Sequence, residues 1–190
     1  MIDKALSFLQ KELNENLKQK MGSTTDLVTL TTFISQGGEL EIDSGTLGMM
    51  VVNIEEEKMF RSVAPQTVQV GNNYTMVNPE LKLNVYMMIA ANHSTHQEAL
   101  KLISNTILFF QGRNSFSNVE SPALDDVEQL TLDLYTINFE QQNQLWASLG
   151  AKYMPSVMYR IRMLIMNDKL VRDTAPAVTA FERTFAGGRE

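Results

Sequence analysis

The spacing of apolar residues at the start of the chain is helical. Residues 3–21 carry apolar side chains three or four positions apart, which predicts an amphipathic helix with the stripe Ile2, Ala5, Leu6, Leu9, Leu13 and Leu17. Asp3 is placed to cap the start of this helix, and Gly22 is expected to end it.

Three runs have the alternation of strands. Residues 24–35 are rich in β-branched side chains but alternate loosely, so they predict a weak strand or one arm of a hairpin. Residues 46–57, TLGMMVVNIEEE, begin apolar and become acidic, which predicts a strand that leaves the core towards Glu55, Glu56 and Glu57. Residues 81–91 alternate with period two and predict a central strand with one face made of Leu81, Leu83, Val85, Met87 and Ile89.

A helix and a further strand follow. Thr95 and Glu98 have the spacing of a capping box, and the helix should run to about Phe110, with the stripe Ala99, Leu100, Ile103, Ile107 and Phe110. Gly112 is expected to stop it. Residues 127–137 predict a strand in which Leu130, Leu132 and Leu134 face one way and Thr131, Asp133 and Tyr135 the other.

Three segments lack periodicity. Residues 58–80 contain proline, glycine and several asparagines, which is typical of a long loop. Residues 112–126 predict a second irregular segment. The tail, residues 169–190, is expected to be an arm or a disordered end.

The segment before the tail predicts a capped helix and a strand. Asn138 can cap a helix with Gln141 reaching back, and Gly150 suits the left-handed residue that closes it. The apolar edge of this helix is Leu145, Trp146 and Leu149. Because Pro155 cannot donate to a β-ladder, the next strand should start at or just after it.

That last strand has one apolar face and one face with two arginines. Val157, Tyr159, Ile161, Met163 and Ile165 share the apolar face, and Arg160 and Arg162 lie on the other. One interpretation is that the arginines are solvated or pair with a carboxylate such as Asp133 on a neighbouring strand. The other is that they reach another subunit.

The order of these elements predicts the fold class. Helix, strands, helix, strand, helix and strand describe an α/β (α+β) domain with a mixed, mostly antiparallel sheet and flanking helices. A chain of 190 residues with 44% hydrophobic content fits one continuous core. We therefore expect one domain over residues 1–168, followed by the tail over residues 169–190.

Composition excludes several classes of partner. The formal net charge is −6 and no block of Lys or Arg stands out, so nucleic acid is not an expected partner. The chain has no cysteine, which removes disulfides, thiolate metal sites and cysteine nucleophiles. The first twenty residues lack the apolar core of a signal peptide, and no run is long and apolar enough for membrane insertion.

No residue pattern of catalysis stands out. His93 and His96 could place two nitrogens near a metal, but no third ligand has helpful spacing, so a solvated or capping role is favoured. Three consecutive acids in a strand, such as residues 55–57, point to alternate faces and favour a solvated strand end. Because phosphate-binding, dinucleotide-binding and nucleophile-elbow motifs are also missing, we expect no catalytic, cofactor or metal site and no enzymatic activity. A small-ligand or enzymatic domain with an unrecognised pocket stays open as an alternative.

Five stretches of the chain carry a resemblance. They are FEQQNQLWASLGAKYMPSVMYRIRM from residue 139, NIEEE at 53–57, LNVYMMIAAN at 83–92, FFQ at 109–111 and the opening MIDKALSFLQKELN. In this order, across residues 1 to about 167, the chain resembles the cap or tail-terminator family of phage-tail-like contractile injection systems, of the antifeeding-prophage and virulence-cassette type.

The resemblance implies a structural role. It implies a fold similar to phage tail terminators and a homo-oligomeric ring, a hexamer, on the distal end of the inner tube and sheath, where it ends their polymerisation. Assembly would take place in the cytoplasm, and the particle would then be released or membrane-anchored. Candidate residues for the subunit or the tube and sheath interface are Arg160, Arg162, Asp133, Trp146 and Tyr153. An adaptor elsewhere in the same particle is the alternative. The twelve methionines and Trp146 are interpreted as core filler, with an interface role as the alternative.

Overall fold

The computed structural model describes residues 1–57, 66–70, 73–77, 81–119, 121–124, 127–165 and 173–176 of the chain. Its helices are α1 (Ile2–Met21), α2 (His96–Gly112) and α3 (Phe139–Leu149), with a short 3₁₀ helix, η1 (Pro122–Leu124). The strands in chain order are β1 (Val28–Leu30), β2 (Thr46–Glu56), β3 (Gln66–Val70), β4 (Asn73–Val77), β5 (Leu81–Asn92), β6 (Ser115–Ser117), β7 (Val127–Leu134), β8 (Ser156–Ile165) and β9 (Asp173–Pro176).

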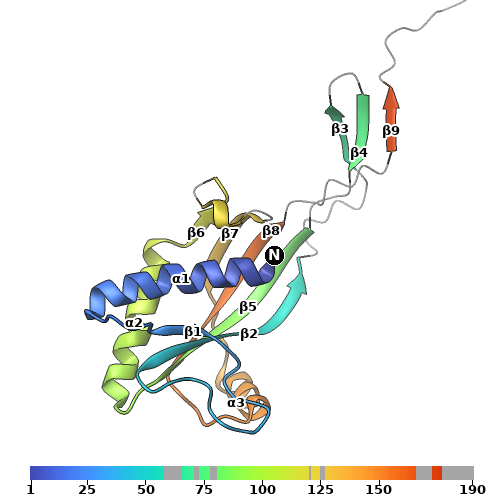
Figure 1. Ribbon diagram of the computed structural model, residues 1–190. Helices are drawn as coiled ribbons and strands as arrows, with labels where there is room; N and C mark the ends of the chain where they lie inside the picture. The colour runs from blue at the N-terminus through green and yellow to red at the C-terminus, as the bar shows by residue number, and fades with distance from the viewer. Residues whose placement is uncertain are drawn as a thin grey trace, which may run out of the picture.

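Within the described residues the strands form two sheets (Figure 1). The larger sheet has six strands in the order β1-β2-β5-β8-β7-β6, and the smaller has three in the order β3-β4-β9. Strands β1 and β2 run parallel, and every other neighbouring pair is antiparallel. The predicted mixed, mostly antiparallel sheet is therefore confirmed, with β5 in its interior between β2 and β8.

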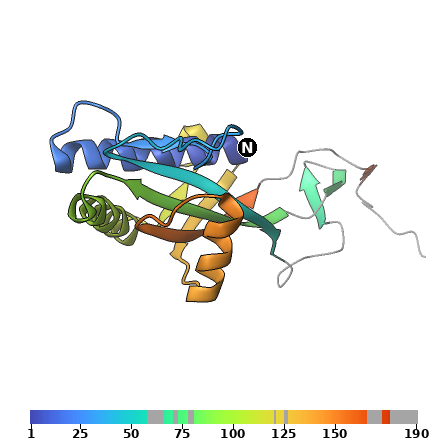
Figure 2. The ribbon, with the colours of Figure 1, turned by 90° about the horizontal axis from the view of Figure 1, so that it is seen from below.

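The main core lies between one face of the six-stranded sheet and the helices α1 and α2. Strands β5, β7 and β8 contribute Val85, Leu132 and Ile161, which are at most 3% exposed and belong to one cluster with Leu9 of α1. Tyr159 also points into this cluster, and burial raises the pKa of its hydroxyl to about 12. Figure 2 shows α1 on one side of the sheet and α3 on the other.

A second, smaller core lies on the α3 side of the sheet. Trp146 is 4% exposed there and stacks on Phe33, with ring centroids 6.0 Å apart. The other buried members of this cluster are Ile42, Met88, Ala90 and Met158. Trp146 is thus core, as one of the two interpretations of the sequence held, and the segment between β1 and β2 helps to cover this face.

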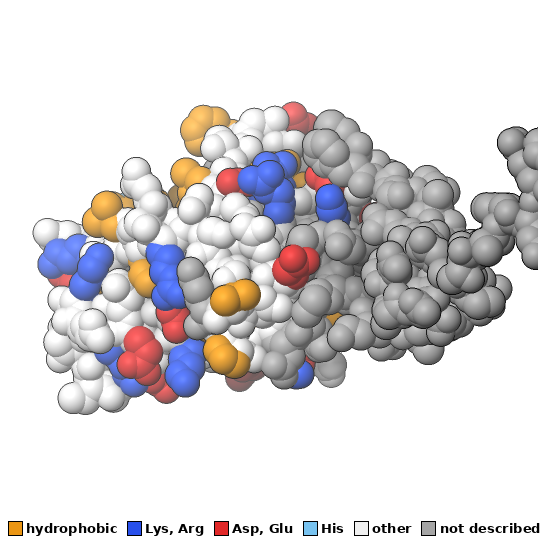
Figure 3. All heavy atoms as spheres, turned by 90° about the horizontal axis from the view of Figure 1, so that it is seen from above, with side chains coloured by type: hydrophobic (Ala, Val, Ile, Leu, Met, Phe, Trp, Pro, Cys, Tyr) orange, Lys and Arg blue, Asp and Glu red, His pale blue; other side chains and the backbone are white. Residues whose placement is uncertain are grey.

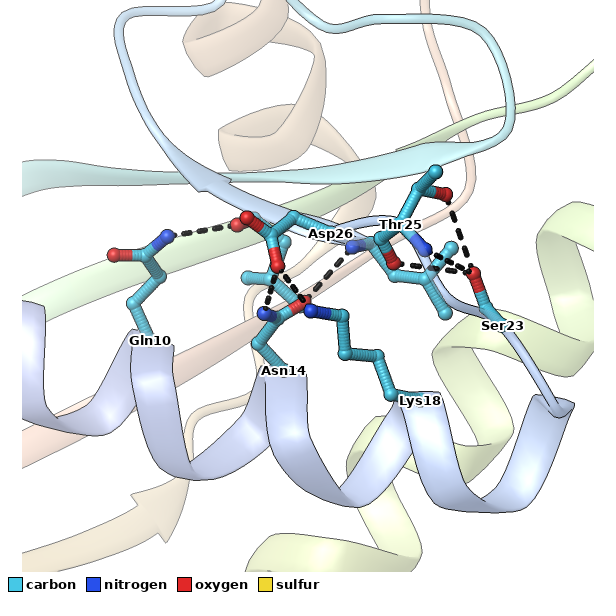
Figure 4. Close-up of polar contacts among 8 residues, drawn as sticks. Gln10, Asn14, Lys18, Ser23, Thr25 and Asp26 are labelled. Atoms are coloured by element: carbon cyan, nitrogen blue, oxygen red, sulfur yellow. Dashed lines mark hydrogen bonds and ion pairs between the residues drawn. The ribbon is translucent and has the colours of Figure 1, made fainter.

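Polar side chains of α1 hold the edge strand β1 in place (Figure 4). Gln10 Nε2 donates to the carbonyl of Val28 at 2.8 Å, and Asn14 Oδ1 accepts from the backbone N–H of Leu27 at 2.8 Å. Asn14 Nδ2 and Lys18 Nζ both bond to Asp26 Oδ1, at 2.7 and 2.6 Å. The hydrogen bond from Lys18, followed by that from Asn14, lowers the pKa of the Asp26 carboxyl.

The local signals of several elements are confirmed. Helix α3 has the predicted capping box, because Asn138 Oδ1 accepts from Gln141 N–H and the Gln141 side chain accepts from Asn138 N–H. Gly150 closes α3 with φ at 68°, and β8 starts directly after Pro155. Strand β2 is buried in its first half and exposed towards Glu55, as its change from apolar to acidic predicted.

Two details of the predicted helices are wrong. Asp3 does not cap α1, because the N-cap is Met1 and Asp3 lies in the first turn. Leu100 is 45% exposed, since the buried stripe of α2 is Ala99, Leu102, Ile103, Thr106 and Phe110. The rotation of α2 depends on its packing partners, which the local pattern does not contain. On β7, Leu134 keeps the predicted common direction with Leu132 and is 56% exposed at the strand end.

The irregular segments hold more structure than predicted. Residues 66–70 and 73–77 pair as a hairpin, β3 and β4, inside the predicted loop. The second irregular segment contains η1 and β6, whose Phe116 is buried against the main core. In the tail, β9 pairs antiparallel with β4. The remaining residues of 58–80 and 169–190 lie outside the described residues.

Candidate functional site

The α3 side of the six-stranded sheet changes character along its strands. On β5 and β8 this side is apolar where α3 covers it, at Met88 and Met158, and becomes polar two residues further on. We call this polar region of the sheet the polar sheet face. Its residues are Glu55 of β2, Asn84 and Tyr86 of β5, Thr131 and Asp133 of β7, and Arg160 and Arg162 of β8. Strand pairing brings these residues together: the register aligns Glu55 with Asn84, Asn84 and Thr131 with Arg162, and Tyr86 and Asp133 with Arg160.

Both arginines pair with one carboxylate. Asp133 Oδ2 lies 3.3 Å from Arg160 Nη2 and 2.9 Å from Arg162 Nη2. The Arg162 side chain is 52% exposed, against 35% for Arg160 and 33% for Asp133. The predicted pairing with Asp133 is therefore confirmed. Two positive charges share one negative charge, and the more exposed guanidinium keeps free hydrogen-bonding capacity.

The neighbouring strands add polar and aromatic groups. Tyr86 hydroxyl donates to Glu55 Oε2 at 3.1 Å, and Asn84 Nδ2 donates to Glu57 Oε2 at 2.9 Å. The Tyr86 ring meets Tyr135 edge-on, with centroids 4.9 Å apart. Burial, followed by the hydrogen bond to Glu55, raises the pKa of the Tyr86 hydroxyl. This arrangement holds the side chains in fixed positions across three strands.

A cavity of about 300 Å³ opens on this face beside Arg162. Asn84 and Lys82 line it from β5, and Gln129 and Thr131 from β7. Asn84 is 6% exposed, and its Oδ1 has no hydrogen-bond partner among the described residues. A buried acceptor without a partner is unusual in a folded chain, so a donor from outside would improve the local hydrogen bonding.

The structure separates the predicted interface residues into two groups. Arg160, Arg162 and Asp133 lie together on the polar sheet face, whereas Trp146 is buried under α3. Tyr153 is 62% exposed and meets Trp146 edge-on, with centroids 5.8 Å apart. Trp146 therefore offers almost no surface to a partner, while Tyr153 and Arg162 do.

Sequence reasoning missed the β5 residues of this face. Asn84 and Tyr86 alternate with the apolar residues of β5, so their common direction is visible in the sequence. Their position beside the arginines depends on the β5–β8 register, which cannot be read from the sequence alone. Figure 3 shows the molecule from above, with basic and acidic side chains interspersed and hydrophobic ones scattered.

The described residues contain no cluster of three or more His, Cys, Asp or Glu side chains that could hold a metal ion. His93 accepts at Nδ1 from the backbone N–H of Thr95, at 3.3 Å, in the turn before α2. The Thr95 hydroxyl in turn accepts from Glu98 N–H, which is one of the two hydrogen bonds of the predicted capping box. In the part of the chain that the structure covers, no helix is both long and apolar enough to cross a bilayer.

Comparisons with known proteins give a family and two related folds. Residues 5–180 match the family described as Pvc16 N-terminal domain. The fold is similar to the PVC sheath/tube terminator, in its extended state, of an extracellular contractile injection system. The TM-score is 0.69 and the identity 14%, over 100% of this chain and 64% of that one. It is also similar to the tube-terminating cap of the anti-feeding prophage, with a TM-score of 0.58 and 11% identity, over 93% of this chain and 60% of that one. The chain thus spans less than two thirds of either structure, and no curated protein matches it in sequence.

Proposed function

The chain belongs to the Pvc16 N-terminal domain family, and from that premise we propose that it is a structural cap of a contractile injection particle. It binds the distal end of the inner tube and sheath and ends their polymerisation. The two similar structures are a sheath/tube terminator and a tube-terminating cap, which supports this role. The role is mechanical and needs no catalytic residue.

The observation that carries the proposal is the family match over residues 5–180, together with the two similar folds. The sheet edges also matter, because they are where another strand could add. A free edge strand is a template for another strand, so a chain that ends a polymer should not offer a long one. In the six-stranded sheet, the edge strands β1 and β6 have three residues each. Strand β1 pairs with only Leu47, Gly48 and Met49 of β2, so β2 continues beyond it along the same edge of the sheet.

The β1 edge is also occupied. Leu27 carbonyl and Thr31 N–H bond to β2, so by alternation the carbonyl of Val28 points away from the sheet. Gln10 of α1 donates to that carbonyl, which removes its free acceptor. Strand β1 has only three residues, and Gln10 of α1 occupies the carbonyl of one of them.

We propose further that the cap is a ring of identical subunits, a hexamer, and that Arg160, Arg162, Asp133 and Tyr153 lie at its contacts. A contact repeated around a ring acts once for each subunit, so no single patch needs to be strongly apolar. This agrees with the mixed charge of the polar sheet face. Such a cap would assemble in the cytoplasm and then remain part of the particle.

The proposed domain division follows the same logic. Residues 1–168 form the tail-terminator-like unit, and residues 169–190 form an arm. The antiparallel pairing of β9 with β4 supports an arm that returns to the hairpin of its own chain. Removal of residues 169–190 should therefore weaken attachment to the tube and sheath more than it weakens folding of the six-stranded sheet.

Deletion of the gene in a particle-producing strain tests the proposal. Electron microscopy should show tubes or sheaths that are overlong, unstable or prematurely contracted, and the unaltered chain supplied in trans should restore the normal length. The variant Leu100→Ala is a matched control, because this exposed leucine should not matter for capping. Particles of normal length and end structure without the chain would reject the cap and favour the adaptor.

A further inference from the structure

We propose that the side chain of Asn53 closes the open edge of β2 to strand addition, and that Glu55 and Tyr86 hold it in position. The open edge is residues 50–56, the part of β2 that runs on beyond Met49, the last residue paired with β1. Within the described residues, no strand pairs with this part of β2 on the side away from β5. In Figure 1 the arrowhead of β2 accordingly lies well beyond β1.

The inference adds a residue to the proposed cap, which should not offer a long free strand to a further subunit. It rests, however, on contacts within one subunit. The open edge is the longest stretch of such backbone that the short strands β1 and β6 leave on the six-stranded sheet. Whether it can accept another strand depends on the state of its outward-pointing N–H and carbonyl groups.

The register with β5 shows which of these groups point outwards. Glu57 N–H donates to the carbonyl of Lys82 at 2.9 Å, so the backbone of Glu57 bonds towards β5. Successive residues of a strand direct their backbone groups to alternate sides, and Ile54 comes three residues before Glu57. Ile54 therefore directs its N–H away from β5, into the open edge. An added strand would need this N–H as a donor.

Asn53 already occupies this donor. Ile54 N–H donates to Asn53 Oδ1 at 2.9 Å, an ordinary length for a hydrogen bond. The amide oxygen thus stands where the carbonyl of an added strand would have to lie. A strand that paired here would leave one of its own carbonyls without a donor, which is costly between paired strands, and would also meet the Asn53 side chain.

Two further hydrogen bonds hold the Asn53 side chain in place. Asn53 Nδ2 donates to Glu55 Oε1 at 2.9 Å, and the Tyr86 hydroxyl donates to the other oxygen of that carboxylate at 3.1 Å. The Tyr86 ring in turn packs edge-on against Tyr135. Because both ends of the Asn53 amide are bonded, its oxygen stays directed at the edge. Glu55 and Tyr86 are positioning residues, since neither bonds to Ile54 N–H.

A β-bulge brings these side chains to the same side of the sheet. The register shifts between Val51 and Asn53, which leaves Val52 as the extra residue. Asn53 consequently lies opposite Tyr86, and both line a cavity of about 330 Å³ with Glu55 on the α3 side. A bulge also increases the local twist of an edge strand, which makes pairing with a further strand harder.

Amide hydrogen exchange of the full chain measures the Asn53 contact directly. Asn53→Ala should speed exchange of the Ile54 N–H about tenfold or more, because this N–H loses its acceptor. Tyr86→Phe should give a smaller increase, since Glu55 then loses one of its hydrogen bonds. Asn143→Ala is the matched control and should change nothing, because this exposed asparagine of α3 does not line the cavity beside Asn53. Unchanged exchange at Ile54 in Asn53→Ala would overturn the proposal.

Self-association of the purified chain measures the consequence. By light scattering, Asn53→Ala should form larger species than the unaltered chain at the same concentration, whereas Asn143→Ala should not. Ile54→Pro, added to Asn53→Ala, should return the size to that of the unaltered chain, because proline has no N–H and is tolerated at a sheet edge. Ile54→Lys should do the same by placing a charge on the edge. Circular dichroism checks that each variant is folded.

Two results of this second assay would count against the proposal. Faster exchange at Ile54 without larger species would show that Asn53 does not close the edge. Larger species that persist with both Ile54→Pro and Ile54→Lys would show that association uses another surface. Because the assay uses the purified chain, either result leaves the cap untouched, and the gene deletion tests the cap separately.

Discussion

The assignment of the main core leads to a sharp prediction for two leucines. Leu132 is 3% exposed within the cluster that also holds Val85 and Ile161, whereas Leu100 is 45% exposed on α2. The sequence patterns placed both leucines in the core, whereas the structure buries only Leu132. Replacing each by alanine therefore tests which of the two assignments of burial is correct. We expect Leu132→Ala to destabilise the fold strongly and Leu100→Ala to have little effect.

The magnitude follows from what each substitution removes. Leucine to alanine removes three carbon groups, worth about 0.8 kcal/mol each when buried, or roughly 2.4 kcal/mol for Leu132 before any cavity term. A residual cavity adds to this, within the range of about 2 to 5 kcal/mol seen for such changes. Leu132 also borders a cavity of about 510 Å³ between α2 and β7, which limits the additional loss of packing contacts. We therefore expect Leu132→Ala to lower the free energy of unfolding by about 3 kcal/mol. For Leu100→Ala the loss should be less than about 1 kcal/mol, because much of this side chain is already hydrated.

Urea unfolding provides the measurement. Trp146 is the only tryptophan, is buried, and stacks on Phe33, so its fluorescence reports loss of the fold. Leu132→Ala should lower the urea midpoint with little change in the denaturant slope, and should lower Tm by roughly 6 to 12 °C for a chain of this size. A loss below about 1 kcal/mol at Leu132, or an equal loss at Leu100, would refute the assigned strand and helix phases.

Three further predictions concern polar contacts. Asn14→Ala should cost about 1 to 3 kcal/mol, because Leu27 N–H loses its acceptor, and the urea midpoint measures the loss; no change would mean that water replaces the side chain. The folded-state pKa of Asp26 is lowered by Lys18, so its contribution to stability is present above the unfolded-state value and is lost as pH falls through the folded-state value. The difference in urea midpoint between the unaltered chain and Asp26→Asn should therefore shrink as pH falls, and a constant difference would contradict the assignment. Asp133→Asn should cost at most about 1 kcal/mol and show coupling to either arginine of the polar sheet face in a double-mutant cycle, whereas strict additivity would exclude the pairing.

Elements whose ends are specified by nearby residues could be predicted from the sequence. Helix α3 is an example, because Asn138, Gln141 and Gly150 specify its two ends without help from the rest of the fold. The two faces of β8 were likewise readable, since alternation fixes which residues share a side.

Elements that depend on distant partners could not be predicted. The exposed Leu100 is an example, since the rotation of α2 about its axis depends on how it packs against α1 and the sheet. Strands β3 and β4 were missed for a different reason. Their sequences, QTVQV and NYTMV, alternate apolar and polar residues and are separated by Gly71-Asn72, which is a hairpin signal that the prediction of a loop overlooked. At the candidate site, the sequence put Asp133 and both arginines on a common side, but their alignment with Asn84 and Tyr86 required the strand register.

The pairing of β4 with β9 has a consequence for the order of folding. Strand β4 precedes β5 in the chain, whereas β9 follows β8, so the chain between the two partners runs through most of the six-stranded sheet. Bringing such distant segments together early would require closing a very long loop, whose entropic cost is repaid only by later contacts. We therefore expect the larger sheet to form first, because pairing of β5 with β8 brings the chain segments next to β4 and β9 closer together. The pairing of β9 with β4 is then expected to form late, so a chain whose larger sheet has not yet formed should lack it.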